Sequence, residues 1–184
     1  MFQYIAFYKP YGVLSQFTPE AGHDSLASFG FPEDVYPVGR LDCDSEGLLL
    51  LSNDGAFIKK LLNPKFGHER EYAVQVDGAI QKDALKTLQK GVVIKGYKTK
   101  PCKARLCDED PDFEPRYPPI RERKNIPTSW IYLTLTEGKN RQVRHMTAAV
   151  GFPTLRLVRI RIEKLSLDGL KTGQWRHIQK KDVL

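Results

Sequence analysis

The sequence predicts an α+β fold with a mixed, mostly antiparallel sheet and flanking helices. Three observations lead to this prediction. Short segments rich in apolar, β-branched and aromatic residues recur along the 184 residues, stretches with helical spacing separate only some of them, and several connections are short enough for hairpins. A parallel α/β sheet would instead need strands and helices in regular alternation, and this pattern has none.

In the first half of the chain, apolar runs predict strands and one run with helical spacing predicts a helix. The four leucines within residues 47–52 are too few for a stable helix, so this run is interpreted as a buried strand. Residues 56–62 have apolar residues at helical spacing, with Asp54 as N-cap and Asn63-Pro64 as a stop. The other expected elements are strands at residues 2–7, 35–38 and 71–76 and a helical turn at residues 25–29.

In the second half, two further helices are expected among strands. Residues 81–90 predict a short amphipathic helix closed by Gly91, and residues 140–150 predict a second one ended by Gly151. Residues 108–127 contain five prolines and several acids, so they are expected to form an irregular excursion outside any strand. The expected strands are residues 92–94, 100–106, 129–136, 154–167 (one or two strands) and 174–178.

Length and composition suit one compact domain over residues 1–184, which two sub-lobes could make up: 41% of the residues are hydrophobic and 28% are charged. No apolar run approaches the roughly 20 residues that span a bilayer, and the N-terminus lacks the pattern of a signal peptide. The three cysteines, Cys43, Cys102 and Cys107, form no Cys-x-x-Cys pair, so they are interpreted as reduced thiols of a cytoplasmic protein. A monomer is the default expectation.

The formal net charge of +7 predicts an acidic partner, of which nucleic acid is the commonest. The alternative is a merely basic, well-solvated surface. Charge alone does not distinguish the two, so the positions of the charged residues must decide.

Residues 39–47 (Gly-Arg-Leu-Asp-Cys-Asp-Ser-Glu-Gly) form an acid-rich loop between two apolar strands. A loop held by rigid elements is a good place for chemistry. In a protein that approaches phosphate, an acidic cluster is unfavourable unless a partner neutralises it or function requires it. Asp42 lies nearest Arg40 and the preceding strand, so it could point into a cleft, whereas Asp44 and Glu46 could be solvated or structural. The alternative is a solvated acidic turn.

Residues 137–146 (Glu-Gly-Lys-Asn-Arg-Gln-Val-Arg-His-Met) form the densest basic segment, at the start of a predicted helix. Asn140 is expected to cap this helix, whose free N–H groups, with Lys139 and Arg141, make an anion site. Arg141 and Arg144 are three residues apart, so they share one helix face. The alternative is an ordinary amphipathic helix with a wet basic face.

Further cations and aromatic rings favour an RNA partner. Each lysine or arginine that contacts a phosphate adds salt-dependent affinity, and each stacked base adds roughly 1–3 kcal/mol. The candidates are Arg121, Arg123 and Lys124, then Arg156, Arg159 and Arg161, and the rings of Tyr72 and Trp130. Most aromatic residues in such a chain are nevertheless expected in the core.

Three segments, taken in order, resemble the motifs of the RsuA branch of the pseudouridine synthases: residues 39–48, residues 70–72 (Arg-Glu-Tyr) and residues 137–144. Any one would be a weak signal, but the ordered set is highly specific. Residues 120–130 and 151–157 are similar to the RluE-type members of this branch, which act on large-subunit ribosomal RNA. The resemblance extends from residue 8 to about residue 175.

The resemblance implies a largely antiparallel, mixed sheet with a central RNA-binding cleft. It implies that Asp42 is the catalytic aspartate and that Arg144 pairs with it. It also implies that Tyr72 packs against the target base and that Arg40 helps to occupy the space that the flipped base leaves. Arg141 belongs to the third motif and is expected to bind substrate.

The sequence departs from this branch in two ways. Many relatives carry an N-terminal S4-type RNA-binding module, whereas this chain starts directly in the catalytic domain, so either RNA recognition rests on the remaining surface or a segment was removed. Cys43 and His145 stand where relatives often have arginine, which bears on substrate specificity more than on the chemistry.

The implied reaction breaks the N1–C1′ bond of uridine, rotates the uracil and reattaches it through C5. It needs no redox step and no external energy, which fits a sequence without a nucleotide-binding glycine loop or a metal-ligand cluster, so no cofactor and no metal is expected. Two other functions are weighed against it: a non-catalytic RNA-binding or ribosome-assembly protein, and another RNA enzyme such as a nuclease or N-glycosylase. The first gives no reason for Asp42 beside the arginine motifs, and four scattered histidines do not offer the ligands of a metal nuclease.

Overall fold

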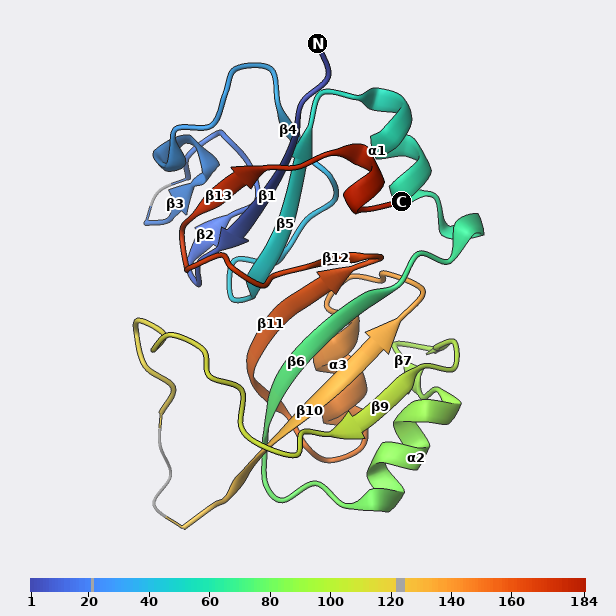
Figure 1. Ribbon diagram of the computed structural model, residues 1–184. Helices are drawn as coiled ribbons and strands as arrows, with labels where there is room; N and C mark the ends of the chain where they lie inside the picture. The colour runs from blue at the N-terminus through green and yellow to red at the C-terminus, as the bar shows by residue number, and fades with distance from the viewer. Residues whose placement is uncertain (21, 122–124) are drawn as a thin grey trace. The chain divides into compact units, whose positions relative to one another are not determined.

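The computed structural model describes residues 1–20, 22–121 and 125–184, and the chain divides into two compact units. The first unit comprises Met1–His68 and Val158–Leu184, and the second comprises Glu69–Leu157. Both contain β-strands with helices beside them, and most of the strand pairs are antiparallel (Figure 1). The predicted α+β class with a mostly antiparallel, mixed sheet is confirmed.

The first unit is built around strand β1 (Tyr4–Lys9), which pairs antiparallel with both β5 (Glu46–Ser52) and β13 (Trp175–His177). Strand β11 (Thr154–Ile162) passes from one unit into the other, and its residues Val158 and Arg159 pair with β5 in parallel. Every residue of β5 is buried, as the interpretation of the leucine run requires. Short strands complete the unit: β4 (Tyr36–Pro37) beside β5, β12 (Leu165–Ser166) beside β11, and the parallel pair of β2 (Val13–Leu14) and β3 (Asp24–Ser25).

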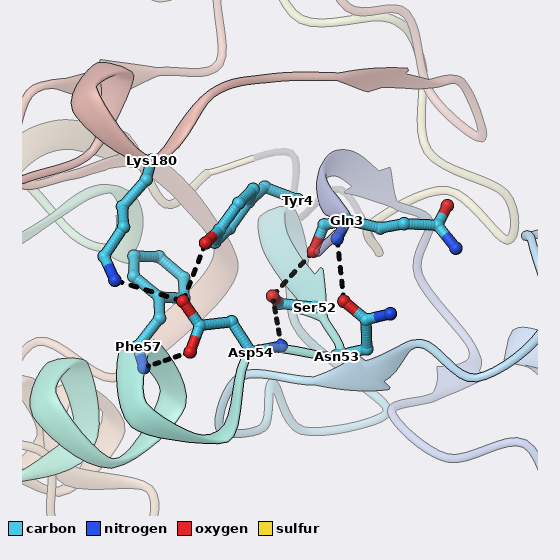
Figure 2. Close-up of polar contacts among 7 residues, drawn as sticks. All are labelled: Gln3, Tyr4, Ser52, Asn53, Asp54, Phe57 and Lys180. Carbon is cyan, nitrogen blue, oxygen red and sulfur yellow. Dashed lines mark hydrogen bonds and ion pairs between the residues drawn. The ribbon is translucent and has the colours of Figure 1, made fainter. Parts of the chain in front are cut away.

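One carboxylate joins three parts of the first unit. Asp54 is the predicted N-cap of α1 (Gly55–Leu62), and its side chain accepts a hydrogen bond from the Phe57 backbone N–H at 3.0 Å. The same carboxylate accepts hydrogen bonds from the Tyr4 hydroxyl at 2.7 Å and the Lys180 ammonium at 3.0 Å (Figure 2). These bonds outweigh the effect of burial and lower the pKa of Asp54 to about 2. Asp54 therefore ties β1 and the C-terminal 3-10 turn (Lys180–Asp182) to the start of α1.

The second unit has strands β6 (Arg70–Asp77), β10 (Thr128–Leu135) and β9 (Lys103–Leu106) in the order β6-β10-β9, all antiparallel. Helices α2 (Lys82–Lys90) and α3 (Gln142–Ala149) bury leucine, valine and methionine side chains against this sheet. Strands β7 (Val93–Ile94) and β8 (Tyr97–Lys98) form a separate hairpin, where the sequence predicted a single strand. Two further short 3-10 helices lie in the first unit: η1 (Leu26–Phe29) and η2 (Pro64–Phe66).

The start of α3 differs from the prediction. The residue at the N-cap position is Arg141, in a left-handed conformation with φ of 51° and without a side-chain capping bond, so the expectation that Asn140 caps this helix is wrong. The Gln142 amide oxygen accepts the Lys139 backbone N–H at 2.9 Å and so closes the turn that precedes the helix. Val143 and Met146 face the core, as their helical spacing predicts.

The excursion at residues 108–121 packs on the second unit through its first half. The Phe113 ring lies 5.6 Å from the Trp130 ring, and the Arg156 guanidinium lies 5.6 Å from the Phe113 ring while donating to the Glu114 carbonyl at 2.9 Å. Trp130 and Arg156, two of the candidate RNA contacts, are each 7% exposed, because this loop covers them. Arg123 and Lys124 of the predicted basic cluster lie outside the described residues.

Among the helices that the structure describes, none is both long and apolar enough to cross a lipid bilayer.

We expect Asp54→Asn to destabilise the protein and to lower its melting temperature by a few degrees at pH 7. The amide keeps an acceptor for the helix cap but loses the charge that holds Lys180. Because the folded-state pKa of Asp54 lies below its unfolded value, the stability that its charge contributes is present above about pH 4 and is lost as the pH falls towards 2. The difference in melting temperature between variant and parent should therefore shrink as the pH falls over this range.

Asp83→Asn is the matched control, because the Asp83 side chain is 96% exposed in the first turn of α2. An Asp54 variant whose deficit is the same at pH 7 and at pH 2 would contradict the role of the charge.

Candidate active site

The acid-rich loop is fixed by backbone hydrogen bonds on both sides of Asp42. The Ser15 hydroxyl accepts the Leu41 N–H at 3.0 Å and donates to the Leu41 carbonyl at 2.7 Å, so both polar groups of that peptide position meet one side chain. The Gly12 N–H donates to the Cys43 carbonyl at 2.8 Å, and the Ser45 N–H donates to the Asp42 carbonyl at 3.0 Å. Asp42 is half-buried in this frame, so its backbone is held while its side chain keeps access to solvent.

Gly47 allows the end of this loop to meet β11. Its φ is 104°, and a Cβ at this position would lie 2.3 Å from the Arg159 carbonyl oxygen and 2.7 Å from the Arg159 nitrogen. No side chain fits there, because the parallel pairing of β5 and β11 brings the two backbones together. Arg159 is buried and donates from Nε to the Leu48 carbonyl at 2.7 Å, so it serves this junction and is not the exposed RNA contact that the sequence predicted.

A buried lysine lies among the acids of the loop. Lys9, the last residue of β1, is fully buried, and its ammonium donates to the carbonyls of Pro10 at 2.8 Å and Val13 at 2.7 Å. Burial lowers the pKa of Lys9 to about 8, against the opposing influence of the nearby Cys43, Glu46, Asp44 and Asp42. Lys9 is therefore largely protonated at neutral pH and neutralises part of the negative charge of the loop.

The Cys43 thiol contributes little to the attraction between Lys9 and the acid-rich loop at neutral pH. Burial raises the pKa of its thiol above the ordinary value, although Lys9 acts in the opposite direction, so the sulfur keeps its proton. Its Sγ lies 3.5 Å from His23 Nδ1. The carboxylates of the loop therefore supply the charge that Lys9 meets, and all three cysteines of the chain are free.

The structure places the predicted site residues in two groups. In the first unit, Arg40 is exposed and lies two residues before the half-buried Asp42. In the second unit, Tyr72 is 9% exposed on β6, where it pairs with Leu133 and belongs to the core cluster that also contains Val143 and Met146 of α3. The core of the second unit thus joins the strand of Tyr72 to the helix of Arg144.

Arg141 and Arg144 lie at the first turn of α3. Arg141 is exposed and Arg144 is half-buried. The left-handed conformation of Arg141 directs the chain from the Gly138-Lys139 turn into the helix, and the Gln142 side chain closes that turn. The basic segment therefore forms a hydrogen-bonded turn that leads directly into the helix.

Sequence reasoning missed Lys9 and Ser15. Lys9 lies beyond the strand expected at residues 2–7, so nothing in that pattern singled it out. The signal that could have found it is the excess of acids over bases in residues 39–47, because buried or clustered charges require a partner. Within the described residues, no group of three or more His, Cys, Asp or Glu side chains is arranged to hold a metal ion.

Residues 3–149 match the model of a protein family described as RNA pseudouridylate synthase. The chain belongs to this family. The resemblance predicted from the ordered motifs is confirmed, and so is the prediction of an RNA pseudouridine synthase, an isomerase. The matched residues include the acid-rich loop, Tyr72 and the basic segment.

Curated relatives cover most of the chain. The chain is 51% identical to ribosomal large subunit pseudouridine synthase E of Vibrio parahaemolyticus over 95% of its own length and 73% of the relative. It is 52% identical to the protein of the same name from Xanthomonas axonopodis over 88% of the chain and 86% of the relative. A crystal structure of a pseudouridylate synthase superposes with a TM-score of 0.81 at 25% identity, covering 99% of this chain and 72% of the other.

We expect Lys9→Met to change how stability depends on pH. In the folded state Lys9 loses its proton near pH 8, whereas in the unfolded chain it does so near pH 10.5. Between these values the unfolded state binds more protons, so rising pH favours the folded parent. The unfolding free energy of the parent relative to Lys9→Met should increase over this window, by roughly 3 kcal/mol at most, since one pKa unit corresponds to about 1.4 kcal/mol.

Urea unfolding of both proteins at intervals between pH 7 and pH 10.5 measures this difference. The exposed Lys65→Met is the control and should track the parent. A difference between parent and Lys9→Met that stays flat across the window would show that Lys9 titrates like an ordinary surface lysine.

Proposed function

We propose that this protein isomerises uridine to pseudouridine in the RNA of the large ribosomal subunit, with Asp42 as the catalytic residue. The observation that carries the proposal is the held position of Asp42: a half-buried carboxylate in a loop that Ser15, Gly12 and the buried Lys9 fix in place. The choice of substrate is supported by about 50% identity to relatives named for the ribosomal large subunit.

The chemistry needs one ionised carboxylate near the sugar of the target uridine. Asp42 either adds to C1′ as a nucleophile or removes the 2′ proton, and both routes break the N1–C1′ bond and release uracil from the sugar. The uracil then rotates and C5 bonds to C1′, while the Asp42–C1′ bond breaks in the first route or the 2′ proton returns in the second. The hydrogen on C5 leaves as a proton, and N1 gains one. Atoms and electrons balance within the substrate, so the reaction requires no added oxidant, reductant or nucleotide.

The other predicted residues bind and orient the substrate. We propose that Arg144 aims the Asp42 carboxylate through a charge-assisted hydrogen bond when the substrate is bound. The target base leaves its stack at a cost of a few kcal/mol, and Tyr72 packs against it. Arg40 occupies the space that the base leaves, and Arg141, exposed at the first turn of α3, contacts phosphate.

We expect Asp42→Asn to abolish isomerisation and leave RNA binding intact. The amide has the size of the carboxylate but is neither a nucleophile nor a base, so turnover should fall by more than roughly a thousandfold. The measurement is tritium release from ribosomal RNA labelled at uridine C5, because C5 loses its hydrogen only when it becomes the glycosidic carbon. Asp44→Asn is the control and should retain most of the activity.

Tritium release by Asp42→Asn at the parental rate would remove Asp42 as the catalyst while keeping the enzyme. If neither the parent nor the variant releases tritium from large-subunit RNA or from ribosomal particles, the proposed substrate is wrong.

We expect Arg144→Ala to lower turnover at saturating RNA roughly a hundredfold. A hydrogen bond to a charged group contributes about 1.5–3 kcal/mol, which corresponds to a 10- to 100-fold change in rate. Arg176→Ala, on the exposed β13, removes an equal charge and serves as the control. Single-turnover tritium release measures the chemical step, and near-parental rates in Arg144→Ala would exclude the pairing with Asp42.

A further inference from the structure

The stretch from residue 84 to residue 107 carries seven lysine and arginine residues and no acid. Three of them lie beside an acid or an aromatic ring of the protein. Lys86 lies 3.7 Å from Asp83, Lys103 bonds Glu69 at 2.7 Å, and the Arg105 guanidinium lies 4.1 Å from the centre of the Tyr132 ring. The remaining four are Lys90, Lys95, Lys98 and Lys100, all exposed, and none of these four forms an ion pair with a described residue.

Three of these four lysines lie on one hairpin, residues 93–100, here called the lysine hairpin. Strands β7 and β8 are joined by the two-residue turn Lys95-Gly96, with φ of 47° and 76°. Positive φ at both positions is the geometry of a tight hairpin turn, in which asparagine or glycine is the favoured first residue. A lysine there is conformationally unfavourable, so its place at the tip indicates a use for the charge.

The base of the hairpin is closed by two hydrogen bonds and a close backbone contact. The Thr99 N–H donates to the Val92 carbonyl and the Val92 N–H donates to the Thr99 hydroxyl, both at 2.9 Å. Gly91 passes so close that a Cβ on it would lie 2.2 Å from the Thr99 carbonyl oxygen. Ile94 anchors the hairpin in the core of the second unit.

A buried carboxylate joins the lysine hairpin to the basic segment. Glu137, 7% exposed, accepts the Tyr97 hydroxyl at 2.7 Å, the Lys100 backbone N–H at 2.8 Å and the Gln142 amide at 2.8 Å. Burial alone would raise its pKa, but these bonds outweigh it and hold the pKa of Glu137 below its ordinary value. The carboxylate is thus ionised and fully occupied within the protein.

The same junction aligns the cations of the two segments. The Lys139 ammonium lies 4.4 Å from the centre of the Tyr97 ring, which is 37% exposed. Lys139 therefore neighbours the hairpin, with the exposed Lys98 and Lys100 on either side of Thr99. The Lys139–Tyr97 contact therefore brings a cation from the start of α3 next to the hairpin.

We propose that the lysine hairpin, with Lys139 beside it, is a docking surface for the phosphate backbone of the RNA substrate. The proposal deepens the proposed function and rests on it, since it assumes that the enzyme acts on RNA. Lysines are suited to this role as mobile point charges that follow a backbone without reading its sequence. Glu137 and Tyr97 then hold this surface in register with Arg141 and Arg144.

The test compares two triple variants that remove the same charge. Lys95→Gln, Lys98→Gln and Lys100→Gln together should weaken binding to large-subunit ribosomal RNA at least roughly tenfold at about 0.1 M salt. Each lost phosphate contact should also reduce the slope of log affinity against log salt by about 0.9, for a total of roughly 2–3. The control combines Lys59→Gln, Lys60→Gln and Lys65→Gln, which are exposed in the first unit, and should bind within about twofold of the parent.

A third variant separates charge from structure. Tyr97→Phe loses the bond to Glu137 but keeps every charge and the ring beneath Lys139, so its salt slope should equal that of the parent. In tritium-release kinetics, the hairpin variant should raise KM for RNA and change kcat little.

The outcomes distinguish the two proposals. Equal losses of affinity in both triple variants, or an unchanged salt slope in the hairpin variant, would overturn the docking surface. A parent that binds RNA but releases no tritium would overturn the proposed reaction instead, and the binding comparison would still decide the hairpin.

Discussion

The first unit depends on one buried ammonium group, that of Lys9. It ends the central strand β1 beneath an acid-rich loop whose carboxylates would otherwise repel one another and the RNA. Removing a lysine from water is costly, and the two carbonyl bonds and the surrounding acids offset this cost only because the geometry is fixed. The loop, the β1 terminus and the turn at residues 10–13 must therefore form together. These three segments set the position of Asp42.

The second unit uses the same device with the signs reversed. There the surface is basic, and the buried charge is the carboxylate of Glu137, which three donors from the β7–β8 hairpin, the segment after it and α3 satisfy. In each unit, a buried residue of opposite charge therefore lies beside a segment that is rich in charge of one sign. Such satisfied buried groups cost little in net stability and fix one arrangement of the loops around them.

The parts of the fold that could be predicted from the sequence are those set by neighbouring residues. The buried leucine strand, the Asp54 cap and the core face of α3 follow from local patterns of apolar and capping residues. The failures share a long-range cause. Arg159 was a candidate for an exposed RNA contact, but it donates to a carbonyl 111 residues away. Trp130 was a candidate for base stacking, but the excursion packs against its ring. Asn140 failed as a cap because the helix starts one residue later, with Arg141 at the N-cap position in a left-handed conformation.

The catalytic candidate was found more easily than its supporting residues, and the chemistry explains why. An isomerisation in which the substrate supplies every atom asks the protein for one carboxylate and for a precise environment around it. Asp42 lies in a charged loop, where a carboxylate is noticed in the sequence. Its environment is built from ordinary residues such as Ser15, Gly12 and Gly47, whose importance comes from what packs against them. Gly47 carries no functional group at all, yet the backbone of β11 lies where its side chain would be, so the absence of a side chain is what allows the loop to close.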